Sequence, residues 1–389
     1  MINYNFLSPV DDLILSHMNL NSSLILGNRI NIFSDISSPP DLANIDVAII
    51  GVCEYRNSEN YLEKSFSLNE IRKTFYSLHP GNWSLNIADL GDLILGETVF
   101  DTYLSIQTVI SDLLKSNIIP IIIGGTQDLT YANYRSYDYL KKTVNIVNID
   151  SKFDLGDSSK PIKNSSFLGK IILDKPHNLF NYSVLGYQTY FNSQEEIDLM
   201  EKLYFEAYRL GELSNNIKNA EPILRDANIV TLDVSSVRSS ELSSKQKFSP
   251  NGFNGNEICA ISRYAGISNK VSSFGIYEYV PSFEDETTEM LIAQILWYFL
   301  EGVSCRIVDN NFHNVDDFQK FTALVDDQEL IFLKSLRSSR WWVEIPFIKN
   351  YNNKLDDHSL LPCMHQDYID ASKGLIPERW FKAQKKNII

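Results

Sequence analysis

Acidic side chains recur in this sequence at the ends of short β-branched runs, where together they could bind a cation. Four acidic residues lie in or at a polar turn that follows such a run: Asp150, Asp154, Asp233 and Glu278. Apolar runs of this length, bounded by turn residues, are typical of strands buried on both faces of a sheet. In an open α/β sheet, ligands bind at the turns that leave the carboxyl ends of such strands. The spacing therefore predicts a carboxylate-lined pocket at one edge of a parallel sheet.

The strands that would position these turns alternate with helical segments. The apolar runs are Val47–Val52, Ile87–Leu93, Ile119–Ile123, Val144–Ile149, Val184–Gly186, Asn228–Leu232 and Val271–Tyr277. Helical periodicity is found in Leu62–Tyr76, Phe100–Lys115, Gln194–Gly211, Glu257–Ala265 and Glu286–Glu301. This alternation predicts an α/β fold with three α-β-α layers and a mostly parallel sheet.

The two ends of the chain differ from this pattern. Residues 1–45 are turn-rich and predict an N-terminal arm that packs on the core, because four of its residues are too apolar to remain in water: Leu13, Ile14, Leu24 and Ile25. Residues 46–304 form the predicted α/β domain. Residues 305–389 form a C-terminal extension, in which Trp341, Trp342 and Trp380 indicate packing of an added segment or a partner interface.

Composition excludes several classes of function. The 389 residues are 44% hydrophobic and carry a formal charge of −14, which argues against nucleic acid or an anionic membrane as partner. The most apolar helical segment, Met290–Leu300, is too short to cross a bilayer. The N-terminus lacks the order of a signal peptide, and the four cysteines are scattered. These features predict a reduced, cytoplasmic protein without membrane insertion.

The strand-end turns resemble those of the ureohydrolase family, which comprises arginase, agmatinase and formimidoylglutamase. That family has GGxH, DxHxD and DxDxxDP turns, followed by a turn that carries a glutamate. The similar turns here, in the same order, are Gly124-Gly125-Thr126-Gln127, Asp150-Ser151-Lys152-Phe153-Asp154, Asp233-Val234-Ser235-Ser236-Val237-Arg238 and Glu278-Tyr279-Val280-Pro281. The resemblance runs from about Val47 to about Gly302 and favours the formimidoylglutamase-like branch. It implies an arginase-like fold.

The resemblance also implies a damaged metal site. In the family, these turns hold two manganese ions that share a bridging hydroxide, which attacks a guanidinium or formimino carbon. The first ion would be bound here by Gln127, Asp150, Asp154 and Asp233, and the second by Asp150, Lys152, Asp233 and Ser235. Gln127 and Lys152 replace histidines, and Ser235 replaces an aspartate. All six histidines of the chain lie outside these turns.

Lys152 is the replacement with the largest chemical consequence. An ammonium has no lone pair and cannot bind a metal. We therefore expect Lys152, with help from Arg238, to supply the positive charge that the second ion supplied. Three aspartates without a cation would otherwise repel one another and have raised pKa values. No cofactor is expected; the alternative is one weakly bound Mn²⁺ or Mg²⁺ on Asp150, Asp154, Asp233 and Gln127.

Three functions are compatible with these replacements. The first is a catalytically inactive pseudoenzyme that serves as a binding or scaffold component, with a protein partner or as a homo-oligomer. The second is a divergent C–N hydrolase that acts on linear amidines with one metal ion or none. The third is a sensor that binds a small ligand in the old pocket through Glu278 and Asp154.

Simpler roles are expected for several neighbouring residues. Asp128 and Asp157 have the position of helix N-caps. Cys53, Cys259 and Cys305 lie in apolar segments and are expected to be inert core thiols. Glu278 could serve as an ordinary salt-bridge partner as readily as a ligand-binding group.

Overall fold

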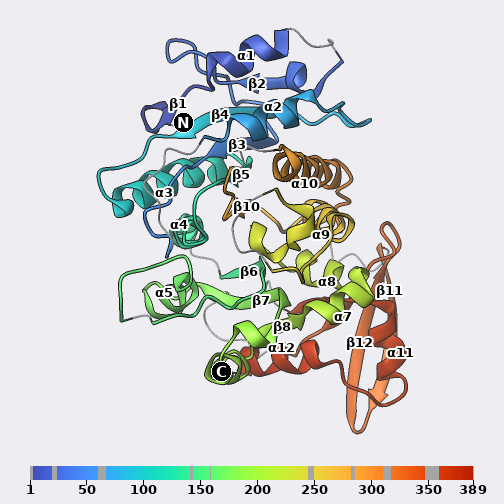
Figure 1. Cartoon of the computed structure of the whole chain (residues 1–389). Helices are drawn as coiled ribbons and strands as arrows, with labels where there is room; N and C mark the ends of the chain where they lie inside the picture. Colours follow the sequence, from blue (N-terminus) through green and yellow to red (C-terminus); the bar gives the residue numbers. More distant parts are fainter. Residues whose placement is uncertain are drawn as a thin grey trace.

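The protein is built around a large, mostly parallel sheet, shown by the computed structural model in Figure 1. The structure describes residues 3–19, 24–59, 67–140, 143–157, 159–243, 249–281, 285–309, 317–346 and 359–388. Within them the sheet has ten strands, in the order β1-β4-β3-β5-β10-β9-β6-β7-β8 with β2 also paired to β4. The strands are β1 Leu7–Ser8, β2 Ile30–Ile32, β3 Val47–Gly51, β4 Ile87–Leu93, β5 Ile119–Ile123, β6 Val144–Ile149, β7 Leu179–Tyr187, β8 Glu206–Arg209, β9 Ile229–Asp233 and β10 Ser273–Tyr277.

Helices cover both faces of this sheet, which confirms the predicted three-layer fold (Figure 1). One face packs on α1 Asp12–Asn19, α2 Asn69–Ser77, α7 Leu210–Asn215, α8 Ala220–Arg225, α9 Gly255–Ile267 and α10 Thr287–Ser304. The other face packs on α3 Val99–Lys115, α4 Leu129–Arg135, α5 Phe167–Leu173 and α6 Gln194–Lys202.

Alternation along the central strands explains why both faces are buried. In β5, Ile121 and Ile123 contact the α9 and α10 side of the sheet, whereas Ile122 contacts the α3 side. Successive side chains of a strand point to opposite faces. A continuous apolar run such as Ile119–Ile123 therefore fits only a strand covered by helices on both sides.

The helix predicted at Gln194–Gly211 is wrong in its second half. Helix α6 ends at Lys202, Tyr204 has a φ of +55°, and Glu206–Arg209 forms the edge strand β8. The carboxylate of Glu206 pairs with Arg379, which lies far along the chain. This non-local contact could not be inferred from helical periodicity.

The N-terminal segment joins the main sheet. Strand β1 pairs antiparallel with β4, and β2 pairs parallel with it. Ile14 and Ile25 are buried as expected, whereas Leu13 and Leu24 are exposed. The division of the chain after residues 45 and 304 stays a prediction.

The C-terminal segment forms a second, four-stranded antiparallel sheet with its own apolar core. Its elements are β11 Phe318–Val325, β12 Gln328–Ser335, β13 Trp341–Glu344, β14 Leu360–Cys363, α11 His365–Ala371 and α12 Glu378–Ile388. Trp341 and Trp380 are buried in this core, so both serve packing. Arg225 of α8 fastens the segment to the main domain, since its guanidinium donates to the carbonyl oxygens of Trp341 and Cys363 at 3.0 Å.

Two further expectations concern membrane crossing and the cysteines. None of the helices in the described residues has the length and apolar character needed to cross a bilayer. Cys259 and Cys363 are buried, but Cys305 is exposed at the end of α10, so the prediction of a core thiol at Cys305 is wrong.

Candidate functional site

The turn between β5 and α4 places Gln127 inside the protein. It begins with Gly124 and Gly125, whose φ angles of +95° and +71° favour glycine. A Cβ atom at Gly125 would lie 2.9 Å from the carbonyl oxygen of Glu54. The backbone of the turn therefore requires both glycines, whatever the turn binds.

The Gln127 side chain connects this turn to two neighbouring strands. Its Nε2 atom donates to Asn148 Oδ1 in β6 at 2.9 Å and to Thr231 Oγ1 in β9 at 2.7 Å. Both Nε2 protons are thus used in buried hydrogen bonds. The Oε1 atom is buried, and no hydrogen-bond partner for it exists in the described part of the chain.

Three of the predicted aspartates form one buried cluster at the ends of β6 and β9. Asp150, Asp154 and Asp233 are each at most 7% exposed. Burial raises the pKa of all three carboxyl groups, and the negative charge of Asp150 raises the pKa values of the other two further. The contact between the two carboxyl groups raises the pKa of Asp154 further and lowers that of Asp150.

Glu278 completes the cluster from the end of β10. Burial raises its pKa to about 7, although hydrogen bonds from the Gln127 backbone N–H and the Asn164 side chain favour its ionised form. Its φ is +60°, and that of Asp154 is +54°. Strained backbone at residues other than glycine is concentrated at functional sites, so the geometry retains a feature typical of an active site.

The structure does not support the role predicted for Lys152. Its side chain is exposed, and it forms no ion pair with the aspartates within the described residues. Its charge lowers the pKa values of Asp150 and Asp154, but burial and the other neighbouring groups have larger effects on both. The Lys152 ammonium thus acts on the aspartates from an exposed position and with a small effect, and its role as a substitute for a second ion stays a prediction.

The other two expected contributors also lie differently. Ser235 is partly exposed, and its backbone N–H donates to Asp233 Oδ1 at 2.6 Å. Arg238 pairs with Glu241 and not with the aspartates. It lines a cavity of about 610 Å³ beside the first turns of α9 and α10, which none of the other predicted site residues lines.

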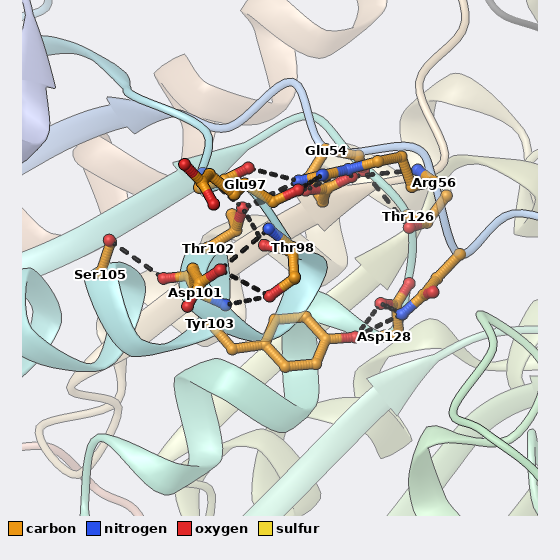
Figure 2. Close-up of polar contacts among 12 residues, drawn as sticks. Glu54, Arg56, Glu97, Thr98, Asp101, Thr102, Tyr103, Ser105, Thr126 and Asp128 are labelled. Atoms are coloured by element: carbon orange, nitrogen blue, oxygen red, sulfur yellow. Dashed lines mark hydrogen bonds and ion pairs between the residues drawn. The ribbon is translucent and has the colours of Figure 1, made fainter.

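A network that sequence reasoning missed holds the turns beside the cluster (Figure 2). Glu54, buried after β3, accepts hydrogen bonds from Arg56 Nε at 2.9 Å and from Thr102 Oγ1 of α3 at 3.0 Å. The carbonyl oxygen of Glu54 also accepts from the Thr126 N–H at 3.0 Å. These contacts tie the β3 and β5 turns to the start of α3. The signal was available, because Glu54 follows an apolar run as Glu278 does.

Asp128 belongs to the same network and is not the simple helix cap that its position predicts. Its carboxylate is fully buried and makes no cap hydrogen bond. It instead accepts from the Tyr103 hydroxyl and from Asn57 Nδ2. Burial raises its pKa. Asp128 therefore links the turn after β3, helix α3 and the turn after β5.

The arrangement agrees with a comparison of the sequence with known families, in which residues 45–301 match the Arginase family. The chain belongs to the arginase family. Its sequence is 31% identical over 148 residues to the formimidoylglutamase of Macrococcus caseolyticus, covering 36% of this chain and 45% of that relative. It is 24% identical over 242 residues to the formimidoylglutamase of Staphylococcus aureus, covering 59% of this chain and 77% of that relative.

Solved structures with a similar fold include two of the same name. The formimidoylglutamase of Bacillus subtilis superposes with a TM-score of 0.61 at 19% identity, over 69% of this chain and 90% of that one. A Trypanosoma cruzi formiminoglutamase solved with Mn²⁺ superposes with a TM-score of 0.60 at 18% identity. The match covers 69% of this chain and 97% of that one. These similarities show the fold. Together with the relatives they confirm the predicted arginase-like family and its formimidoylglutamase-like branch.

The residues present do not fit the paired manganese centre that membership of the arginase family implies. Lys152 cannot bind a metal and lies exposed, and Gln127 fixes its amide nitrogen in two hydrogen bonds. Within the described ranges, there is no group of three or more His, Cys, Asp or Glu side chains that could hold a metal ion. The fold of the arginase family is therefore preserved around an altered site.

Proposed function

We propose that this protein is a non-catalytic member of the arginase family that acts as a binding or scaffold component. The observation that carries the proposal is that Gln127, where the resemblance implies a histidine ligand, joins β5 to β6 and β9 through two buried hydrogen bonds. A glutamine in that arrangement supports the fold. The exposed Lys152 and the partly exposed Ser235 support the same conclusion.

Metal analysis of the purified protein tests this proposal. We expect less than one equivalent of manganese per chain after dialysis against Mn²⁺, and no ammonia, urea or formamide released from formimino or guanidino substrates. Removal of divalent ions by EDTA should leave the melting temperature unchanged. Two equivalents of manganese with turnover would overturn the proposal.

Restoring the ligands provides a second test. The triple variant Gln127→His, Lys152→His, Ser235→Asp should bind manganese if the positions correspond to those of the family. Lys152→His alone is the matched control and should not bind, because the other two ligand positions stay altered. Failure of the triple variant to bind while it remains folded would show that the assignment of the turns is wrong.

A second candidate is an amidine hydrolase that uses one metal ion or none. It is favoured by the buried Oε1 atom of Gln127, which has no partner in the described residues, and by the pKa of about 7 at Glu278. The relatives named formimidoylglutamase indicate the substrate class to assay. Ammonia release that is lost in Glu278→Gln would favour this candidate over the first.

A further inference from the structure

Strand β11 is a long sheet edge with little of the usual protection. The main sheet ends in β1 and β8, which have 2 and 4 residues, and the small sheet ends on one side in β14, which has 4 residues and contains Pro362. Strand β11, on the other side, has 8 residues and a continuous register with β12. Short strands, prolines, bulges and charged side chains normally prevent pairing at an edge. Strand β11 is long and regular and has no proline, and Lys320 is its one charged residue.

The backbone groups that β11 presents outward can be identified. The Leu336 N–H donates to the Asp317 carbonyl oxygen at 3.0 Å, so odd-numbered residues of this strand bond towards β12. The alternation of an antiparallel ladder then directs the N–H and C=O groups of Lys320, Thr322 and Leu324 away from β12. In the described part of the chain, these groups have no hydrogen-bond partner.

The side chains around this edge are exposed and complementary in charge. Leu324 is 70% exposed, and Lys320 and Thr322 are exposed beside it. Asp326 and Glu329 lie at the opposite end of the hairpin from Lys320. Within the described residues none of these three charged side chains is in an ion pair. The hairpin thus carries a cation at one end and anions at the other.

We propose that β11 pairs antiparallel with β11 of a second copy of this chain, so that the two small sheets become one continuous sheet. Pairing centred on Thr322 places each Thr322 opposite its own copy and Lys320 opposite Leu324. All outward N–H and C=O groups then have partners. Lys320 also lies diagonally across from Asp326 of the second copy, and same-face neighbours of this kind interact across strands.

The charge distribution favours contact through this segment. In residues 305–389, lysine and arginine equal aspartate and glutamate in number, so the whole formal charge of −14 falls on residues 1–304. Two copies that met through their main domains would bring two net negative charges together. The neutral segment that contains β11 is the part through which two copies approach at least electrostatic cost. Figure 1 shows the β11–β12 hairpin extending away from the main sheet.

Measurement of the molar mass of the full chain in solution tests the proposal. We expect the mass to rise towards that of two chains as the concentration is raised to about 100 µM, because pairing of one edge buries little area and gives a modest affinity. Thr322→Pro should give a monomer, since it removes an outward N–H and no bond to β12. Thr322→Asp should do the same by placing like charges opposite each other. The control Thr322→Val should remain a dimer.

Cross-linking identifies the register independently of affinity. In a Cys305→Ser background, Thr322→Cys should form an inter-chain disulfide under mild oxidation, because residues opposite each other in such a ladder have Cα atoms about 5.5 Å apart. Leu324→Cys is equally accessible but would be displaced from its copy, so it should not cross-link. A monomeric wild-type chain, or equal cross-linking of both variants, would overturn the proposal. The proposed pairing of β11 goes beyond the proposed loss of catalysis, and separate experiments test the two proposals.

Discussion

At the scale of single residues, the turn after β5 has a structural role. Gln127 forms hydrogen bonds between three strand ends where a histidine ligand is expected. Asp150, Asp154 and Asp233 stay buried together, and their pKa values are raised in consequence. The cluster is therefore a source of unfavourable electrostatic energy at neutral pH unless a ligand or a proton neutralises it.

Asp154→Asn should stabilise the protein by about 1–3 kcal/mol at neutral pH, the usual cost of an uncompensated buried polar group. Asparagine tolerates the φ of +54° and donates to Asp150 without needing a proton. The pKa of Asp154 is raised in the folded state. The cost of ionising this buried carboxyl group is therefore absent when the pH is below the pKa of the unfolded state, and it grows as the pH rises above that pKa. The stability difference should therefore be small at acidic pH and largest at neutral pH.

Chemical denaturation of both proteins across this pH range measures the effect. Asp157→Asn is the matched control. Because the Asp157 carboxylate is exposed, this substitution should change the stability little. A lower stability of Asp154→Asn, together with a fall in the wild-type melting temperature on EDTA treatment, would indicate a bound cation at the cluster.

At the scale of secondary-structure elements, the edge strand β8 and helix α12 illustrate how the C-terminal segment fixes local structure. Arg379 Nε pairs with Glu206 Oε2 at 2.8 Å, and Arg379 also donates to the Pro362 carbonyl oxygen at 2.8 Å. Both side chains are largely buried. The positive charges of Arg379 and Lys386 outweigh burial and lower the pKa of Glu206 to about 2.

Glu206→Gln should destabilise the protein by about 3–5 kcal/mol, since it leaves the guanidinium of Arg379 buried without its counter-charge. The stabilisation from wild-type Glu206 is complete above pH 4.5, which is the ordinary pKa of a glutamate. It is lost as the pH falls towards about 2, the pKa of Glu206 in the folded state. Thermal melts between these pH values should show this loss in the wild type and not in the variant. Glu378→Gln, which removes the partner of Lys382 at an exposed position, is the control and should have little effect.

At the scale of the whole molecule, the main domain and the C-terminal segment are held together by buried polar contacts. Arg225 is one such connection, since it reaches two carbonyl oxygens of the small sheet and lies 4.6 Å from the centre of the Trp342 ring. Arg225→Ala should cost about 3 kcal/mol or more, because hydrogen bonds to a charged group contribute about 1.5–3 kcal/mol each.

Hydrogen exchange locates that loss. In Arg225→Ala, amide exchange should accelerate in β13 and β14, while the central strands β3 and β5 stay protected. Arg263→Ala, which removes a partly exposed ion pair with Glu301, should leave both regions unchanged. Uniform acceleration of exchange throughout the chain would mean that the two parts unfold together.

The sequence by itself determined the central sheet and the order of its turns. Runs such as Ile119–Ile123 and Val144–Ile149 became β5 and β6 with the same boundaries, because a short β-branched run suits only a strand covered on both faces. The gathering of Asp150, Asp154, Asp233 and Glu278 followed, since the carboxyl ends of parallel strands share one edge.

Only the tertiary structure decided where the long polar side chains point and what they meet. Lys152 follows Asp150 closely in sequence yet extends into solvent, and Gln127 turns its amide towards Asn148 and Thr231. The partner of Glu206 lies more than a hundred residues away, at Arg379. Side-chain direction and non-local pairing depend on how distant elements pack, and periodicity along the chain holds no information about either.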